Sequence, residues 1–230
     1  MKTLLTFTLL LSSLSSYAID KMVIGKDNRH QIKERNKQEI HDSIGILVET
    51  GKDENCTGTI IGPRHVLTAT HCIGSGRNLN FIPGNVKRLP NKLSVLLPKS
   101  AIKAKTAIPF PGFSQDTDKE TDLSVVIFES DLPGRPVAVS LFQDAGQIVT
   151  VAGYPSDKTL GTLWEDSGII EEDGSYTLDT FGGQSGSAVR NQNNEIIGVH
   201  ILSNQYYQKN YAMVFKQKHI DFINDVLKKN

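Results

Sequence analysis

Short apolar or alternating runs recur along the chain and are separated by turn residues. Runs of about four to eight residues with this pattern are typical of β-strands. They predict strands near residues 43–48, 58–61, 93–97, 122–128, 147–152, 195–202 and 211–215. Helical spacing is clear only at the end, where Ile220, Ile223, Val226 and Leu227 fall on one face. The pattern therefore predicts an all-β protein with a C-terminal α-helix.

The first 18 residues have a different pattern. A positive Lys2, an apolar run at residues 4–11 and small residues ending at Ala18 are typical of a secretory signal peptide, with cleavage after Ala18. The alternative is a membrane anchor, which needs about 20 apolar residues. Because this run and every later one are much shorter, we expect an exported, soluble protein.

The overall charge gives no sign of a nucleic-acid or membrane partner. The chain has 230 residues with 25 Lys+Arg and 25 Asp+Glu, and removal of residues 1–18 takes away one cation, Lys2, and no acid. A balance this close to zero creates no basic field for nucleic acid or an anionic membrane. The remaining chain is long enough for one domain or two small ones. We expect a monomer whose partners are selected by a local site.

The chain contains two cysteines, Cys56 and Cys72. In an exported protein an even pair favours a disulfide, which here closes a loop of about 15 residues and stabilises the fold by about 3 kcal/mol in the chain-entropy model. A metal site or two free thiols are the alternatives. No second Cys or His pair has metal-ligand spacing, so no metal site is expected.

Three stretches together indicate nucleophilic catalysis. The run GGQSGS at 182–187 places Ser185 between glycines, where the backbone can approach a reacting group and neighbouring N–H groups can bind an oxyanion. TATHC at 68–72 places His71 at the end of an apolar run, and Asp122 begins the strand-like TDLSVVI at 121–127. The order His, Asp, Ser is one in which a serine nucleophile, its base and an orienting acid are known to assemble.

Other residues compete for these roles. Ser187 follows the glycine-flanked bend instead of lying inside it. An acidic loop precedes Asp122, and runs of this kind are usually solvated surface, whereas Asp122 leads directly into an apolar strand. The remaining candidates for the acid and the base are Asp116, Asp118, Glu120, His30, His41, His65 and His219. Calcium could bind the acidic loop, but a spaced, Gly-containing binding loop is missing there.

Four blocks of sequence resemble a known family. These are CTGTIIGPR at 56–64, TATHC at 68–72, AGYPSDKTLGTLWEDSG at 152–168 and DTFGGQSGSAV at 179–189. They resemble the chymotrypsin-like serine endopeptidases and, more narrowly, the secreted bacterial glutamyl endopeptidases. The resemblance runs from about Val23 to the C-terminal helix, with a gap between residues 75 and 120.

The resemblance implies two perpendicular antiparallel β-barrels with the active site between them and a C-terminal helix packed against the second. We expect residues 23–130 to form the N-terminal barrel with His71 and Asp122, and residues 131–230 to form the C-terminal barrel with Ser185. The loop-like run at 131–136 marks the junction. Residues 1–18 are the signal peptide, and residues 19–22 are a possible short pro-segment.

The resemblance also assigns the mechanism. His71 would take the proton of Ser185 during attack, and Asp122 would hold the imidazole in the correct tautomer. The backbone N–H groups of Gly183 and Ser185 match the oxyanion hole of the family, where losing one donor typically costs about 3 kcal/mol. No cofactor is needed for this chemistry, and the partners are protein or peptide substrates.

Two specificities are compatible with the primary pocket. Cation-specific relatives carry an acid six residues before the nucleophile, and that position is Asp179 here. In the glutamyl branch a threonine five residues before the nucleophile and a histidine on the following strand bind the substrate carboxylate. Those positions are Thr180 and His200, and a protonated His200 would add a charge-assisted hydrogen bond. The simpler alternative for His200 is a packing residue on a buried strand.

The sequence VIGKDNR at 23–29 resembles the mature start of the family. There the new α-amino group, here that of Val23, helps to recognise the acidic side chain through Coulomb attraction. This implies that residues 19–22 are removed before full activity. Alternatively, signal cleavage alone produces the mature protein.

One departure concerns the cleft. After His200 the glutamyl branch often has Gly-containing or aromatic segments, whereas this chain has bulky Ile201 and Leu202, which we expect to narrow the pocket or to shift its preferences. The leading prediction is thus a secreted serine endopeptidase that prefers Glu, then Asp, before the cut. The alternatives are narrow, toxin-like specificity, cleavage after basic residues, and an inactive binding protein with a protease fold.

Overall fold

The computed structural model describes residues 21–33, 39–74, 76, 78–84, 89, 92–94, 96–114 and 119–229. The predicted signal peptide, Asp116 and Asp118 lie outside these residues. Within them, no helix is both long and apolar enough to cross a membrane.

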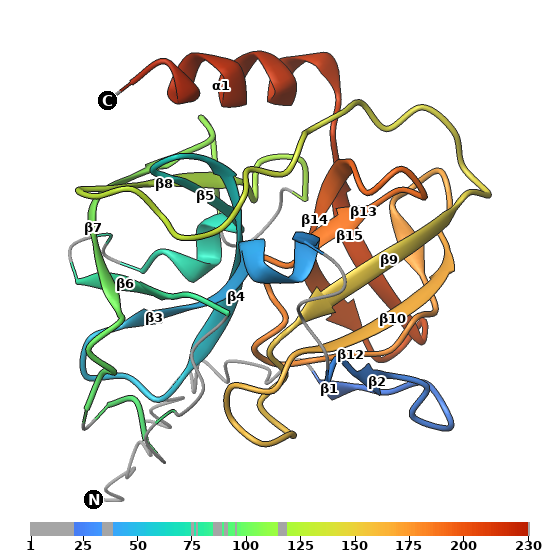
Figure 1. Cartoon of the computed structure of the whole chain (residues 1–230). Coiled ribbons are helices and arrows are strands. Elements are labelled where there is room, and N and C mark those ends of the chain that lie inside the picture. Colours follow the sequence, from blue (N-terminus) through green and yellow to red (C-terminus); the bar gives the residue numbers. More distant parts are fainter. Residues whose placement is uncertain are drawn as a thin grey trace, which may run out of the picture.

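Six strands of the described chain close into a barrel in the order β3-β4-β5-β8-β7-β6, with every neighbouring pair antiparallel (Figure 1). Their bounds are β3 Ile44–Glu49, β4 Asn55–Gly62, β5 His65–Thr68, β6 Leu79–Ile82, β7 Ile102–Pro109 and β8 Ser124–Phe128. β-Branched residues and aromatic rings fill the barrel, and Phe81 and Phe128 meet with ring centroids 5.9 Å apart.

Seven strands of the described chain form a second antiparallel sheet in the order β11-β15-β14-β13-β9-β10-β2. Their bounds are β2 His30–Gln31, β9 Ile148–Gly153, β10 Trp164–Ile169, β11 Ser175–Tyr176, β13 Ala188–Arg190, β14 Ile196–Asn204 and β15 Lys209–Val214. A bridge between Ile170 and Tyr176 links the end of β10 back to β11. An N-terminal strand pair, β1 (Lys21–Met22) with β12 (Thr180–Phe181), lies beside this sheet.

Helix α1 (Gln217–Leu227) follows the second sheet but lies over the first barrel (Figure 1). The His65 ring nitrogen Nε2 is 3.0 Å from Lys229 O, and the ring of Phe110, which follows β7, packs edge-on against Phe222. The expectation that the helix packs against the second barrel is therefore wrong. Its apolar face joins a core that both halves share, because one cluster contains Leu67, Leu123, Val199, Met213 and Ile223.

Most predicted strands are present, but the described residues of the apolar run at 93–97 do not lie in a strand. Among its described residues, Leu93 lies in a turn and is buried, whereas Leu96 is exposed. The run lacks the regular alternation of a half-buried strand, and Pro98 follows it, so Leu93 instead packs against the barrel from a loop. Cys56 and Cys72 form the predicted disulfide, with a Cα–Cα distance of 5.9 Å.

Candidate active site

A histidine and an aspartate from neighbouring parts of the first barrel are hydrogen-bonded. His71 lies in a short 3₁₀ turn, Thr70–Cys72, directly after β5, and Asp122 lies just before β8, the strand that pairs with β5. His71 Nδ1 is 2.7 Å from Asp122 Oδ2, and the backbone N–H of His71 donates to Asp122 Oδ1 at 3.0 Å. The carboxylate is buried and the imidazole is partly exposed. The acid therefore orients a base that solvent or a substrate can reach.

Ser185 lies in a tight loop between β12 and β13 that packs against the strands before His71. Gly186 has φ of 82°, and a Cβ there would lie 2.1 Å from Thr68 Oγ1 and 2.3 Å from Thr57 O. Only glycine fits such a close approach with this backbone conformation. The backbone N–H of Thr57 also donates to Ser185 O at 2.9 Å. The first barrel thus fixes the loop of the second sheet that carries the serine.

The carbonyl groups before the two predicted oxyanion donors are both anchored. Gly182 O accepts a hydrogen bond from Ser156 N at 2.7 Å, and Gln184 O accepts one from Ser187 N at 2.9 Å. In a trans peptide the N–H points away from the carbonyl of the preceding residue. The N–H groups of Gly183 and Ser185 are therefore directed away from these anchors.

Thr57 links the first barrel to the same loop. Its Oγ1 donates to Gly183 O at 2.8 Å and accepts from Tyr154 N at 3.0 Å. The sequence-based predictions did not include Thr57 or Ser156. Both act through groups that lie far away in sequence, so only their position inside the resembling blocks could have indicated a role.

The predicted pocket residues Thr180 and His200 are both buried, and Thr180 contacts the strand that carries His200, β14. Thr180 Oγ1 is 3.5 Å from Ser203 Oγ, and Ser203 and His200 both belong to β14. His200 Nδ1 is 2.6 Å from the hydroxyl of Tyr176, itself fully buried. The sequence-based predictions missed Tyr176 and Ser203, because nothing local to either residue marks it as a neighbour of the pocket.

Burial determines the charge of His200. Desolvation, together with the nearby His71, lowers the pKa of His200 to about 3, although a backbone hydrogen bond with Tyr211 and the charge of Asp122 oppose the shift. His200 is therefore neutral near pH 7 in the substrate-free protein, which argues against the charge-assisted bond that a protonated His200 would add. A neutral imidazole can still donate one N–H.

Asp179 is not free to bind a substrate cation. It is 1% exposed. Its Oδ1 accepts from Ile24 N at 2.6 Å and its Oδ2 accepts from Asn28 N at 2.8 Å, so both carboxylate oxygens bind the N-terminal segment. Val23 lies next to this anchor. Met22 of β1 pairs with Thr180 of β12.

The other histidines and Glu120, which competed for the roles of base and acid, make hydrogen bonds and ion pairs elsewhere in the structure. His30 and His41 each place Nε2 3.1 Å from the Glu165 carboxylate. His65 contacts the end of α1, and the Nδ1 of His219 accepts the N–H of Lys216 at the start of that helix. The carboxylate of Glu120 pairs with two lysines, which lower its pKa to about 2.

Two bulky residues after His200 do not occupy the pocket in the expected way. Ile201 is 3% exposed and belongs to the core shared by the two halves, and Leu202 packs against the same core. The expectation that Ile201 narrows the pocket is wrong, because its side chain is buried in this core; the register of β14 shifts at this point, between His200 and Leu202.

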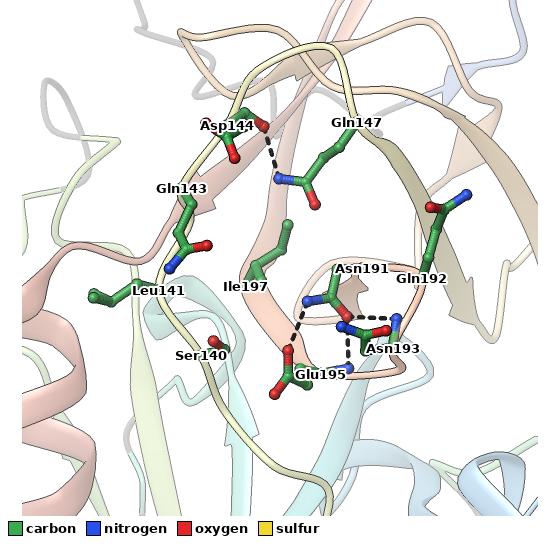
Figure 2. A pocket seen from close by; sticks show the side chains of 10 residues that line it. All are labelled: Ser140, Leu141, Gln143, Asp144, Gln147, Asn191, Gln192, Asn193, Glu195 and Ile197. Carbon is green, nitrogen blue, oxygen red and sulfur yellow. Dashed lines mark hydrogen bonds between the residues drawn. The ribbon is translucent and has the colours of Figure 1, made fainter.

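One hollow in the surface lies beside His71, and a second lies away from the predicted site residues. One of about 100 Å³ borders His71 and is lined by Cys56, Cys72 and residues of the β3–β4 turn. Another, of about 250 Å³, contains none of the predicted site residues (Figure 2). Its polar lining is largely paired internally, because Asn191 bonds Glu195 through Nδ2, and Gln147 bonds Asp144 O.

The arrangement of potential metal ligands gives no usable site near His71. Within the described residues, only Cys56, His71 and Cys72 bring three candidate ligand atoms within 4.8 Å of one another. Both sulfur atoms belong to the disulfide and cannot act as thiolate ligands.

A closed barrel, a second antiparallel sheet, and a His–Asp pair on the first barrel with a glycine-flanked serine in a loop packed against the strands before that histidine make this a chymotrypsin-like serine protease fold. The trypsin family model matches residues 31–224, and the chain belongs to this family.

Several relatives share the sequence pattern. The glutamyl endopeptidase of Bacillus licheniformis is 32% identical over 75% of this chain, which spans 55% of the length of that protein. The glutamyl endopeptidase of Staphylococcus epidermidis is 29% identical over 86% of this chain, which spans 72% of its length. This chain thus covers only about half to three quarters of these relatives.

A solved structure of a Glu endopeptidase superposes with a TM-score of 0.75 at 24% sequence identity, covering 90% of this chain and all of the other. A thermostable serine protease, AL20, from an extremophilic microorganism gives a TM-score of 0.66 at 17% identity, covering 84% of this chain and all of that protein. Both likenesses show the fold.

Proposed function

We propose that this chain is an exported serine endopeptidase that cleaves peptide bonds after acidic residues, Glu in preference to Asp. The observation that carries the specificity is the pairing of Asp179 with Ile24 and Asn28. It removes the carboxylate that a lysine or arginine side chain would need. The neighbouring Thr180 and His200 remain as neutral hydrogen-bonding groups.

The proposed catalysis follows from the His71–Asp122 geometry. His71 Nε2 accepts the proton of Ser185 as its Oγ forms a bond to the scissile carbonyl carbon. The same proton then passes to the departing amine, leaving an acyl-enzyme, and water attacks with His71 again as the base. Asp122, bonded to Nδ1 at 2.7 Å, stabilises the imidazolium form without being protonated itself.

The oxyanion hole is the second part of the proposal. The N–H groups of Gly183 and Ser185 donate to the oxygen of the tetrahedral intermediate. Support comes from the anchored carbonyls of Gly182 and Gln184, which orient both N–H groups before substrate arrives. Preorganised donors cost no rearrangement during the reaction, which is why they stabilise the transition state strongly.

The pocket recognises the substrate carboxylate through hydroxyl and imidazole donors. Thr180 Oγ1 and the Nε2–H of His200 are the proposed donors, and Ser203 lies close enough to Thr180 to contribute a third. A buried site built from donors rejects substrates that lack the matching acceptor, because its polar groups are then left unpaired. This argument favours Glu over Gln and over apolar residues.

Maturation completes the proposal. Residues 1–18 act as a signal peptide, and removal of residues 19–22 exposes the α-amino group of Val23. Ile24 is held on Asp179 next to Thr180, so the new ammonium would form beside the pocket. Met22 pairs with Thr180 in the uncleaved chain, which supports a lower activity before cleavage.

Fluorogenic peptides that differ only at the residue before the cut test the specificity. We expect the protein with Val23 as its first residue to hydrolyse the Glu peptide fastest, then Asp, with Gln and Lys at least about 100-fold slower in kcat/KM. Thr180→Val should reduce the Glu-to-Gln ratio more than it reduces Gln cleavage. Preferred cleavage of the Lys peptide would contradict the proposed pocket.

A further inference from the structure

Gln184, the residue before Ser185, hydrogen-bonds across the nucleophile loop to Phe181. The side chain of Gln184 is buried, and its Oε1 accepts the backbone N–H of Phe181 at 3.0 Å. The backbone N–H of Gln184 donates to Phe181 O, also at 3.0 Å. The same Oε1 lies 3.5 Å from Nη1 of Arg29. A charged side chain from the N-terminal segment therefore reaches the residue next to the nucleophile.

Arg29 is held by two carboxylates. Its side chain is 0% exposed. Nε and Nη2 each donate to one oxygen of Asp27 at 2.9 Å. Nη1 and Nη2 donate to the two oxygens of Asp157 at 3.1 and 2.6 Å. Such double pairs fix a guanidinium in position as well as in charge.

The electrostatics agree with this geometry. Burial opposes the charge on Arg29, but hydrogen bonds and Coulomb attraction from Asp27 and Asp157 outweigh it and raise the pKa of Arg29 above its ordinary value. Removing a partner from a buried pair is strongly destabilising because the remaining charge is left unpaired. Arg29 therefore ties the N-terminal segment to the loop that contains Asp157.

The loop that contains Asp157 also fixes the predicted oxyanion donor, the N–H of Gly183. Asp157 follows Ser156, whose N–H fixes the carbonyl of Gly182 at 2.7 Å and thereby the direction of the Gly183 N–H. Arg29 thus reaches the predicted oxyanion hole by two routes, through Asp157 to Gly183 and through Gln184 to Ser185.

We infer that Arg29 is a positioning residue for the oxyanion hole, acting through Asp157 and Gln184. The inference rests on the proposed function of the Gly183 and Ser185 N–H groups. Because none of these contacts involves the amino group of Val23, the hole is formed before residues 19–22 are removed. Pro-segment removal then changes substrate recognition, whereas Arg29 controls the stabilisation of the transition state.

Arg29→Gln and Asp157→Asn test this role in the chain that starts at Val23. We expect each variant to lower kcat by about 10- to 100-fold, since small misplacements of catalytic groups have effects of this size, with KM changing less than about threefold. Affinity for a peptide boronate, which forms a tetrahedral adduct on Ser185, should fall by the same factor as kcat/KM. The double variant should lose about as much kcat as the less active single variant, because both substitutions break the same linkage.

Arg190→Gln is the matched control. Arg190 is a buried arginine of β13, 3.4 Å from the Glu165 carboxylate, and its Nη1 donates to Asn194 Oδ1 at 2.8 Å; within the described residues these bonds lead away from the nucleophile loop. We expect it to lower the melting temperature while kcat per titrated active site stays within about twofold. Arg29→Lys, which keeps the charge but not the double pairing, should recover only part of the lost kcat.

Equal kcat losses in the Arg29 and Arg190 variants, or unchanged boronate affinity in Arg29→Gln and Asp157→Asn, would overturn the inference while leaving the protease assignment intact. If Arg29→Gln does not fold, the partly exposed Asp157 still supports the same measurement. Wild-type protein that neither cleaves peptides nor binds the boronate would overturn the proposed function and this inference together.

Discussion

At the scale of single residues, the same side-chain type has two different surroundings in this site. The His71 imidazole is partly exposed and bonds a buried carboxylate, which suits a group that must accept and release a proton. The His200 imidazole is buried against the Tyr176 hydroxyl, which suits a fixed, neutral donor. Environment, not residue type, separates the base from the binding group.

Because each stands in a distinctive context of small or apolar residues, the local sequence was sufficient to select His71, Asp122 and Ser185 as candidates, of which the structure hydrogen-bonds the first two. It was not sufficient for the charge of His200. That property depends on Tyr176, which precedes His200 by 24 residues, and on burial that several strands create together. The hydrogen bonding of the Asp179 carboxylate likewise depends on an N-terminal segment, because its partner Ile24 lies 155 residues away in sequence.

Substitution of the proposed catalytic residues should remove turnover. We expect Ser185→Ala, His71→Ala and Asp122→Asn each to lower kcat by about 10⁴-fold or more, because nucleophile, base and orienting acid act as one unit. Ser187→Ala is the matched control, since its buried Oγ has no hydrogen-bond partner within the described chain. Steady-state kinetics with circular dichroism as a folding check would test this. Comparable losses in Ser187→Ala and Ser185→Ala would contradict the assignment.

The neutral His200 predicts a flat pH dependence of specificity. With its pKa lowered to about 3, His200 stays uncharged from about pH 5.5 to 8, and a Glu side chain is ionised over the same range. The ratio of kcat/KM for Glu and Gln peptides should therefore stay constant there. If an imidazolium recognised the substrate, the ratio would fall as the pH rose through about 6.5. Parallel pH profiles of the two peptides distinguish the cases.

At the scale of elements, alternation and apolar runs identified six strands (β3, β4, β8, β9, β14 and β15) but misjudged the middle of the first barrel. The described residues of the apolar run at 93–97 lie outside any strand. β7 was missed because Lys103 and Lys105 give it a polar face. β10 was missed for a similar reason, since Glu165 and Asp166 interrupt it and both are partly or fully buried in polar networks. Pairing partners, which sequence alone does not reveal, decide such strands.

The nucleophile loop predicts a steric test. Gly186→Ala would place a Cβ against Thr68 Oγ1 and Thr57 O, so the loop must move, and we expect kcat/KM to fall by about 100-fold or more. Gly146→Ala has nearly the same φ, 81°, but no atom within 4 Å of the added Cβ. It should cost only about 1 kcal/mol of stability and leave kinetics unchanged. Similar activities of the two variants would show that the loop tolerates displacement.

At the scale of the whole molecule, the two halves are joined by a shared core, by the N-terminal segment and by α1. The helix begins after the second sheet and covers the first barrel, and its apolar face packs into the core that the two halves share (Figure 1). Helical periodicity predicted the terminal helix, whereas the family resemblance placed it on the wrong half. The side that a helix covers depends on its direction after the last strand, which periodicity does not specify.

This arrangement predicts one cooperative unfolding transition. Ile223 is 0% exposed, and Ile223→Ala should lower the free energy of unfolding by about 2–5 kcal/mol. The partly buried Ile220 offers a control with a smaller loss. Fluorescence of Trp164, the single tryptophan and a residue of β10, should report the same urea midpoint as far-UV circular dichroism. Separate midpoints would show that the halves unfold independently.

The central claim is acid-specific cleavage by Ser185, and a cleavage-site profile tests it most directly. Protein that starts at Val23 and its Ser185→Ala variant would be incubated with the same mixed peptide library, and the products would be identified by mass spectrometry. The account predicts cuts after Glu, fewer after Asp, and none with the variant. Cuts after Lys or Arg would contradict the pocket formed by Thr180 and His200, and cuts that persist in the variant would contradict the catalytic role of Ser185.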